Sequence, residues 1–202
     1  MDFSPRFEQT VIVRPSSYVE RLNVSAQFPE ERPVEIELGA GDGSFLVQWA
    51  ALNPQTNFFG VERLLGRLRK IDRRARRLAL TNVRALRLEA AYFAEYLLSP
   101  ATISAFHIYF PDPWPKRKHR PNRLVTEPFT EVLRVALAIG GVVYLRTDDH
   151  DYFGQMTSAF GANPNFEPVS TPERLASVLT GFERKFNDGG IPTRRVAYRR
   201  IA

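Results

Sequence analysis

Residues 34–52 read VEIELGAGDGSFLVQWAAL, with two apolar segments separated by three alternating glycines. The first segment, 34–38, predicts a strand, and the second, 44–52, predicts a helix that Asn53-Pro54 ends. Gly39, Gly41 and Gly43 permit a tight turn between them and let the backbone approach a ligand. This stretch therefore predicts the first strand, loop and helix of an α/β domain.

The same alternation continues along the chain. Further strands are predicted at 57–61, 83–88, 103–110, 141–147, 165–170 and 193–200, and helices at 64–80, 90–98, 124–137 and 150–161. Strands that alternate with helices predict an α/β fold, in which a mostly parallel sheet carries helices on both faces. Residues 1–33 are expected to form an N-terminal arm, and 34–202 a single domain.

The composition excludes several classes of protein. The 202 residues include no cysteine, which excludes disulfides and makes a cytoplasmic setting the default expectation. No run of about 18 apolar residues occurs, so no membrane span is expected. The three histidines, His107, His119 and His150, form no metal-binding pattern, and we predict no metal site.

The glycine loop indicates the chemistry of a ligand. Its G-x-G-x-G spacing differs from the dinucleotide fingerprint G-x-G-x-x-G, and it has no P-loop lysine. Glu37 precedes the loop and Asp42 lies inside it. Carboxylates repel phosphate and suit an ammonium group, which favours a ligand such as the amino-acid part of S-adenosylmethionine.

Acidic residues also follow the next two predicted strands. Glu62 could accept hydrogen bonds from both hydroxyls of a ribose, and Glu89 could meet an adenine amino group. Each one alone is more often a helix cap or an ion-pair partner. Together with the glycine loop, they predict a cofactor that contains a nucleoside at the carboxyl edge of the sheet.

The predicted helix 64–80 is strongly basic. Its apolar residues recur on one face, and basic residues follow the same spacing one position earlier, at Arg63, Arg67, Lys70, Arg74 and Arg77. Asp72 is the only acid within the cluster. The pattern fits either a solvated surface or a phosphate-binding surface. Because the whole chain also has a net charge of +6, we favour the phosphate-binding surface.

Residues 106–124 read FHIYFPDPWPKRKHRPNRL, and they turn from an apolar strand into three prolines and a basic tail. The proline rings fix φ and restrain the preceding residues, which predicts a rigid loop around Asp112. Trp114 could stack on a base or cap the core, and the sequence leaves both open.

These motifs together resemble bacterial tRNA (guanine-N7-)-methyltransferases, the family that methylates guanine-46 in the variable loop of tRNA. The resemblance rests on ELGAGDG (37–43), GVER (60–63), NVRAL (82–86), IYFPDPWPKRKHRPNRL (108–124), YLRTDDHDY (144–152) and TGFERKF (180–186). It implies a Rossmann-like class I fold, S-adenosylmethionine as methyl donor and tRNA as partner. The sequence leaves open whether the protein is a monomer or a homodimer.

The resemblance also implies roles for single residues. Asp112 is the expected catalytic residue. The expected cofactor-binding residues are Glu37, Gly39, Gly41, Gly43, Glu62, Glu89 and Asp112. The expected substrate-binding residues are Lys116, Arg117, Lys118, Arg120, Arg123, Asp148, Thr180, Gly181, Phe182 and Glu183.

The sequence departs from the family pattern at two of these positions. Glu89 stands where the family usually has Asp, and Gly181 stands where it has Lys, which removes a positive charge near the substrate. Two other classes of function remain possible at this level. They are a methyltransferase that acts on another RNA or a small molecule, and a non-catalytic RNA-binding protein on an enzyme fold.

Overall fold

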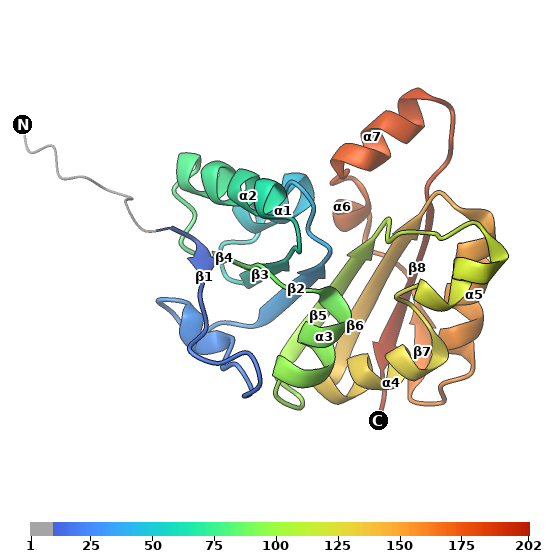
Figure 1. The fold of residues 1–202 in the computed structure, drawn as a ribbon, viewed down its shortest axis with the longest axis horizontal. Helices are drawn as coiled ribbons and strands as arrows, with labels where there is room; N and C mark the ends of the chain where they lie inside the picture. The colour runs from blue at the N-terminus through green and yellow to red at the C-terminus, as the bar shows by residue number, and fades with distance from the viewer. Residues whose placement is uncertain (1–9) are drawn as a thin grey trace, which may run out of the picture.

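The computed structural model describes residues 10–202, and within them eight strands form one sheet (Figure 1). The sheet has the order β1-β4-β3-β2-β5-β6-β8-β7. The strands are β1 (Ile12–Val13), β2 (Val34–Leu38), β3 (Asn57–Val61), β4 (Val83–Leu86), β5 (Ile103–Tyr109), β6 (Leu137–Thr147), β7 (Phe166–Val169) and β8 (Arg194–Arg200).

The strands from β1 to β6 pair in parallel, while β8 is antiparallel to both β6 and β7. The chain moves outward from β2 through β3 to β4, and then crosses to the other side of β2 to form β5. Because of this reversal, the loops after β2 and β5 lead away from each other and leave a crevice at the carboxyl ends of these strands. Open α/β sheets bind their ligands at such a position. The predicted mostly parallel α/β fold is confirmed.

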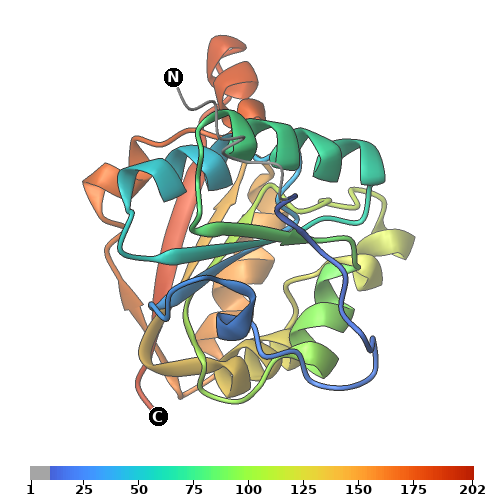
Figure 2. The ribbon, with the colours of Figure 1, turned by 90° about the vertical axis from the view of Figure 1, so that its left-hand side faces the viewer.

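Helices cover both faces of the sheet (Figures 1 and 2). The α-helices of residues 10–202 are α1 (Ser44–Leu52), α2 (Leu65–Arg77), α3 (Ala90–Tyr92), α4 (Glu127–Ala136), α5 (His150–Gly161), α6 (Glu173–Ala176) and α7 (Gly181–Asp188). One apolar core packs α4 and α5 against the sheet through residues such as Leu133 and Phe160. A second core packs α1 and α2 through residues such as Phe45 and Ile71.

Gly43 is required at the start of α1. Its φ is 74°, in the left-handed region, and a Cβ there would lie 2.8 Å from Cγ1 of Ile71 in α2. Any side chain would therefore strain the backbone and push the two helices apart. The glycine loop keeps its position because α1 and α2 pack tightly behind it.

Several boundaries differ from the sequence predictions. Helix α4 begins at Glu127 rather than at residue 124, because Thr126 is its N-cap and Pro128 occupies its first turn. Strand β6 begins at Leu137 rather than at residue 141, because the strand extends back through Gly140, whose φ is 81°. The predicted helix 90–98 is a short α3 followed by a π-helical turn at Phe93–Leu97.

Residues 10–33 pack on the main body of the fold. Strand β1 pairs with β4 at the sheet edge, and Val24 and Phe28 are buried in the first core. Residues 1–9 of the expected arm lie outside the described residues. Among the helices of residues 10–202, none has the length and apolar character needed to cross a bilayer.

Candidate active site

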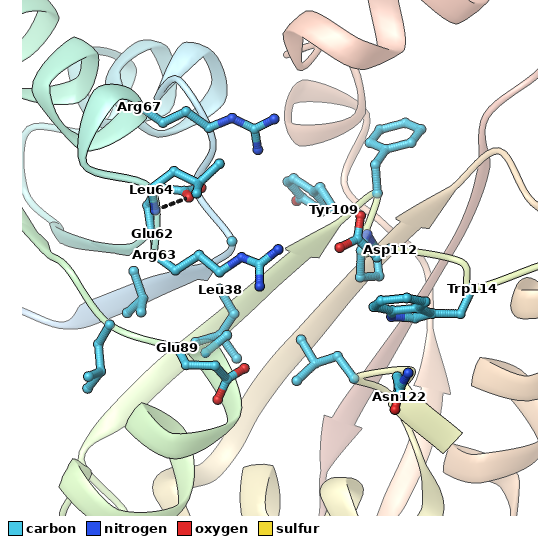
Figure 3. Close-up of a pocket in the computed structure, with 17 residues that line it drawn as sticks. Leu38, Glu62, Arg63, Leu64, Arg67, Glu89, Tyr109, Asp112, Trp114 and Asn122 are labelled. Atoms are coloured by element: carbon cyan, nitrogen blue, oxygen red, sulfur yellow. Dashed lines mark hydrogen bonds between the residues drawn. The ribbon is translucent and has the colours of Figure 1, made fainter. Parts of the chain in front are cut away.

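Two adjoining cavities, of about 310 and 250 Å³, open where the chain reverses direction at β2 and β5. The first contains the ends of β3 and β4, and the second contains the glycine loop and the start of α7. Figure 3 shows the first, with Glu62 and Arg67 on one side and Asp112 and Trp114 on the other. The two cavities share Gly39, Arg67, Tyr109, Phe110, Pro111 and Asp112 in their walls.

Glu37 lines the second cavity at the end of β2, where it is only 3% exposed. One carboxylate oxygen, Oε2, is buried without a hydrogen-bond partner among the described residues. Burial raises the pKa of the Glu37 carboxyl well above its ordinary range, although the nearby Arg146 guanidinium acts in the opposite direction. A ligand ammonium would give this oxygen the partner that the protein does not supply.

Glu62 ties the glycine loop to the end of β3. One carboxylate oxygen accepts a hydrogen bond from the Gly41 amide at 2.9 Å, and the other accepts one from Leu64 at 2.8 Å. Since a carboxylate oxygen has two lone pairs, each keeps one further acceptor site, and Glu62 lines the first cavity. The geometry therefore fits both a structural role and the predicted contact with ribose hydroxyls.

Glu89 lies at the rim of the same cavity as the N-cap of α3. Its Oε2 accepts a hydrogen bond from the Tyr92 amide at 2.7 Å, which fixes the side chain at the cavity edge. The carboxylates of Glu62 and Glu89 both line this cavity, at the ends of neighbouring strands (Figure 3). This is the arrangement that the sequence predicts for a nucleoside.

Asp112 lies in the wall between the two cavities. Among residues 10–202 no donor forms a hydrogen bond with its carboxylate, so the group is available to a ligand. The neighbouring Phe110 and Trp114 have φ values of 50° and 45°, a region that aromatic residues rarely adopt. Backbone strain of this kind costs about 1–3 kcal/mol per residue and is concentrated at functional sites.

Arg123 holds the proline-rich loop in place. It is 4% exposed, and its guanidinium donates to the Pro113 carbonyl at 2.7 Å, to Gln155 at 2.9 Å and to Asp151 at 2.7 Å. All three nitrogens of its guanidinium group therefore bond within the protein, although the sequence predicts Arg123 among the RNA-contacting residues. It anchors the loop around Asp112 to α5.

The rest of the basic tail faces solvent. Lys116, Arg117, Lys118 and Arg120 are exposed, and Arg117–Asn122 forms a short 3-10 helix. Arg120 also pairs with Asp151 at 3.1 Å. Trp114 lines the first cavity and belongs to neither apolar core, so of its two possible positions the structure favours the cavity (Figure 3).

Residues from α7 and the end of β6 close the second cavity. Asp148, Thr180, Gly181 and Phe182, four of the predicted substrate-binding residues, line it. The Gly181 amide donates to the Ser44 hydroxyl at 2.8 Å, which joins α7 to the start of α1. The structure thus brings these residues together with the glycine loop across a long sequence separation.

Glu183 occupies a different position from the other predicted substrate residues. It is fully buried, lines neither cavity and forms ion pairs with Arg146 and Arg195. It also forms a capping box with Thr180 at the start of α7. We conclude that Glu183 positions the segment rather than reaching a ligand in this conformation.

The sequence did not identify two residues at the junction of the cavities. Arg67 lines both, and its guanidinium lies 5.9 Å from the centre of the Phe182 ring. Tyr109 also lines both, and its hydroxyl contacts His107 at 2.8 Å. The sequence does hold a signal for Arg67. It lies in the first turn of a helix that starts at the carboxyl edge of the sheet, where ligands bind.

Within residues 10–202, no group of three or more potential ligands could hold a metal ion. His107 is buried and bonds Tyr109 and Glu35, each at 2.8 Å. It therefore serves the core of the fold.

Comparisons with known proteins place this arrangement in a family. Residues 31–195 match a family model described as "Putative methyltransferase". A tRNA (guanine-N(7)-)-methyltransferase from Geobacter metallireducens is 35% identical over 158 residues, which cover 78% of this chain and 75% of that protein.

Solved structures share the fold at low identity. The 16S rRNA methyltransferase KamB aligns with a TM-score of 0.63 at 15% identity, over 88% of this chain and 90% of that one. A geranyl diphosphate C-methyltransferase from Streptomyces coelicolor, solved with S-adenosyl-L-homocysteine, aligns with a TM-score of 0.57 at 14% identity, over 86% and 71%. The extent of the family match and the identity to the curated relative show that this chain belongs to the tRNA (guanine-N(7)-)-methyltransferase family.

Proposed function

We propose that the protein transfers a methyl group from S-adenosylmethionine to N7 of guanine-46 in the variable loop of tRNA, in the cytoplasm. The observation that carries the proposal is the position of Asp112. Its carboxylate stands between a cavity with nucleoside-binding acids and a cavity with a buried, unpartnered carboxylate. Cofactor and target base would meet at that wall.

The cofactor fits the two cavities through distinct groups. Glu37 receives the ammonium of the methionine part, and the turn of Gly39, Gly41 and Gly43 lets the backbone approach it. Glu62 accepts the ribose hydroxyls, and Glu89 the adenine amino group. S-adenosylmethionine supplies an electrophilic methyl group on a sulfonium.

The chemistry needs little proton transfer. Guanine N7 has a free lone pair at neutral pH, so no base has to remove a proton. The N7–carbon bond forms as the carbon–sulfur bond breaks, and the positive charge passes from sulfur to the base. Asp112 stabilises that charge and accepts hydrogen bonds from the N1 and N2 edge of guanine, while the strained, proline-flanked backbone keeps it oriented.

The substrate side combines phosphate and base contacts. Lys116, Arg117, Lys118 and Arg120 bind the RNA backbone, since they are exposed and lie in sequence between Trp114 and Asn122, which line the first cavity. Asp148, Thr180, Gly181 and Phe182 contact the target nucleotide from the second cavity. The guanine is unstacked to enter it.

Transfer of a labelled methyl group to an unmodified tRNA tests this function. We expect label in tRNA, and nuclease digestion should yield 7-methylguanosine as the labelled nucleoside. Label in another nucleoside, or in small molecules only, would support another methyltransferase. A protein that binds RNA but fails to bind S-adenosylhomocysteine would be the non-catalytic alternative.

Replacing Glu37 by Gln should weaken binding of the cofactor while stabilising the free protein. Loss of one partner of a buried charge pair costs about 2–5 kcal/mol, so the dissociation constant should rise roughly 30-fold or more. Calorimetric titration with S-adenosylhomocysteine measures this. The matched control is Glu167→Gln, an exposed acid on β7 outside both cavities.

The stability effect of Glu37→Gln should depend on pH. The raised pKa means that the folded protein holds this proton more tightly than the unfolded chain, whose carboxyl has the ordinary value of 4.5. The contribution of the Glu37 proton to the stability of the wild-type protein is therefore complete below pH 4.5, and it is lost as pH rises through the folded-state pKa. Thermal unfolding should show the advantage of the variant growing with pH, whereas a constant difference would contradict a buried carboxylate.

A further inference from the structure

The outward face of α2 is a basic surface that extends away from the cavities. Its buried face consists of Leu68, Ile71 and Ala75, which pack against the sheet. The exposed cations of this helix are Arg67, Arg69, Lys70, Arg73, Arg76 and Arg77. Figure 2 shows α2 lying along the outside of the molecule.

The few acids near α2 are already engaged. Asp72 accepts hydrogen bonds from the Thr10 hydroxyl and the Val11 amide, and it pairs with Arg76 at 3.7 Å. Asp42 pairs with Arg74 at 2.8 Å. Among the described residues, no carboxylate lies within 4.0 Å of the charged groups of Arg69, Lys70, Arg73 or Arg77.

Three of these cations, together with Arg74, surround one shallow depression. Lys70, Arg73, Arg74 and Arg77 line it, at helical positions i, i+3, i+4 and i+7. Like charges at these spacings destabilise a helix by a few tenths of a kcal/mol per pair. The helix dipole favours basic residues only in the last turn, at Arg74, Arg76 and Arg77, so it does not account for Lys70 and Arg73.

We propose that this α2 surface, centred on Lys70, Arg73 and Arg77, binds phosphates of the tRNA outside the target nucleotide. Arg67 lines both cavities, and the helix continues from it to Arg77 for about 15 Å at 1.5 Å per residue. An RNA whose guanine enters the cavity can therefore follow this face of the protein. The inference rests on the proposed function, because it assumes that tRNA is the substrate.

The test compares two double variants that remove the same charge. Lys70→Gln with Arg73→Gln removes two cations from the α2 surface. Arg134→Gln with Arg199→Gln removes two cations that pair with Glu131 and Glu167 and lie outside both cavities. Binding of unmodified tRNA is measured over a range of salt concentrations, together with kcat and KM for methyl transfer and affinity for S-adenosylhomocysteine.

For the α2 variant, we expect the slope of the logarithm of the tRNA association constant against the logarithm of the salt concentration to become shallower by about two units, one for each lost phosphate contact. The dissociation constant for tRNA at moderate salt and the KM should rise roughly tenfold. The kcat at saturating tRNA and the affinity for S-adenosylhomocysteine should stay within twofold of the wild type. The melting temperature should not fall, because two mutually repelling cations are gone.

A salt slope and KM equal to those of the control variant would overturn the inference and leave α2 as a solvated surface or a site for an acidic protein. That outcome is separate from failure of the proposed function, in which the wild-type protein itself would not methylate tRNA. An equal loss in both double variants would also contradict a specific surface, since it would reflect net charge alone.

Discussion

Replacing Asp112 by Ala should reduce kcat for methyl transfer by about 10²–10³, the usual effect of removing a group that stabilises charge in the transition state. Asp112→Asn should lose nearly as much, because the amide keeps the shape but not the negative charge. The fold should be unaffected, since no described residue forms a hydrogen bond with this carboxylate. Single-turnover transfer from labelled cofactor to tRNA measures the chemical step directly.

The matched control for this result is Asp188→Ala, an exposed acid at the end of α7 that lines neither cavity. It should transfer methyl groups at the wild-type rate. If Asp112→Ala raised KM for tRNA but left the single-turnover rate unchanged, Asp112 would bind the substrate without assisting the reaction. Near-normal rates and KM in both variants would remove it from the site altogether.

Replacing Glu183 by Ala should destabilise the protein by about 3–5 kcal/mol, the cost of leaving a buried charge without its partner. Arg146 is 1% exposed and bonds Glu183 at 2.9 Å and the carbonyls of Val178 and Leu175. Its guanidinium also lies 4.3 Å from the centre of the Tyr109 ring. Loss of Glu183 therefore weakens the link between the segment before α7 and the strand that carries the Asp112 loop.

Urea unfolding measures this effect, and two further variants separate its causes. Arg195→Ala removes the partly exposed partner of Glu183 and should cost only about 1 kcal/mol. Glu183→Gln keeps hydrogen-bonding capacity but not charge, so its decrease in the free energy of unfolding should lie between those of Glu183→Ala and Arg195→Ala. A Glu183→Ala protein as stable as the wild type would show that the ion pair with Arg146 contributes nothing net to folding.

The core of the fold could be predicted because its signals are local. The strand at 34–38, the helix at 44–52 and the strand at 57–61 have the predicted bounds. Each is set by an apolar pattern, and the first two are also bounded by proline or glycine, at Pro33, Gly39, Gly43 and Pro54. The acids at the strand ends meet at one edge because parallel strands place their carboxyl ends together.

The burial of Arg123 and Glu183 could not be predicted, because it depends on contacts with residues far away in the sequence. Arg123 belongs to a basic run typical of a surface, yet Asp151 and Gln155 of α5 draw it into the interior. Glu183 belongs to a motif that suggests substrate contact, yet Arg146 from a distant strand buries it. Spacing along the chain gives no information on partners that arrive from about 30 residues away.

The most direct test of the account is to map the modified guanine in a single tRNA after reaction with enzyme and cofactor. Strand cleavage specific for 7-methylguanosine should cut the tRNA at one site, guanine-46. A tRNA with adenine at that position should give none, and the Asp112→Ala enzyme should give little. Cleavage at another guanine, or a methylated tRNA that resists this cleavage, would contradict the account.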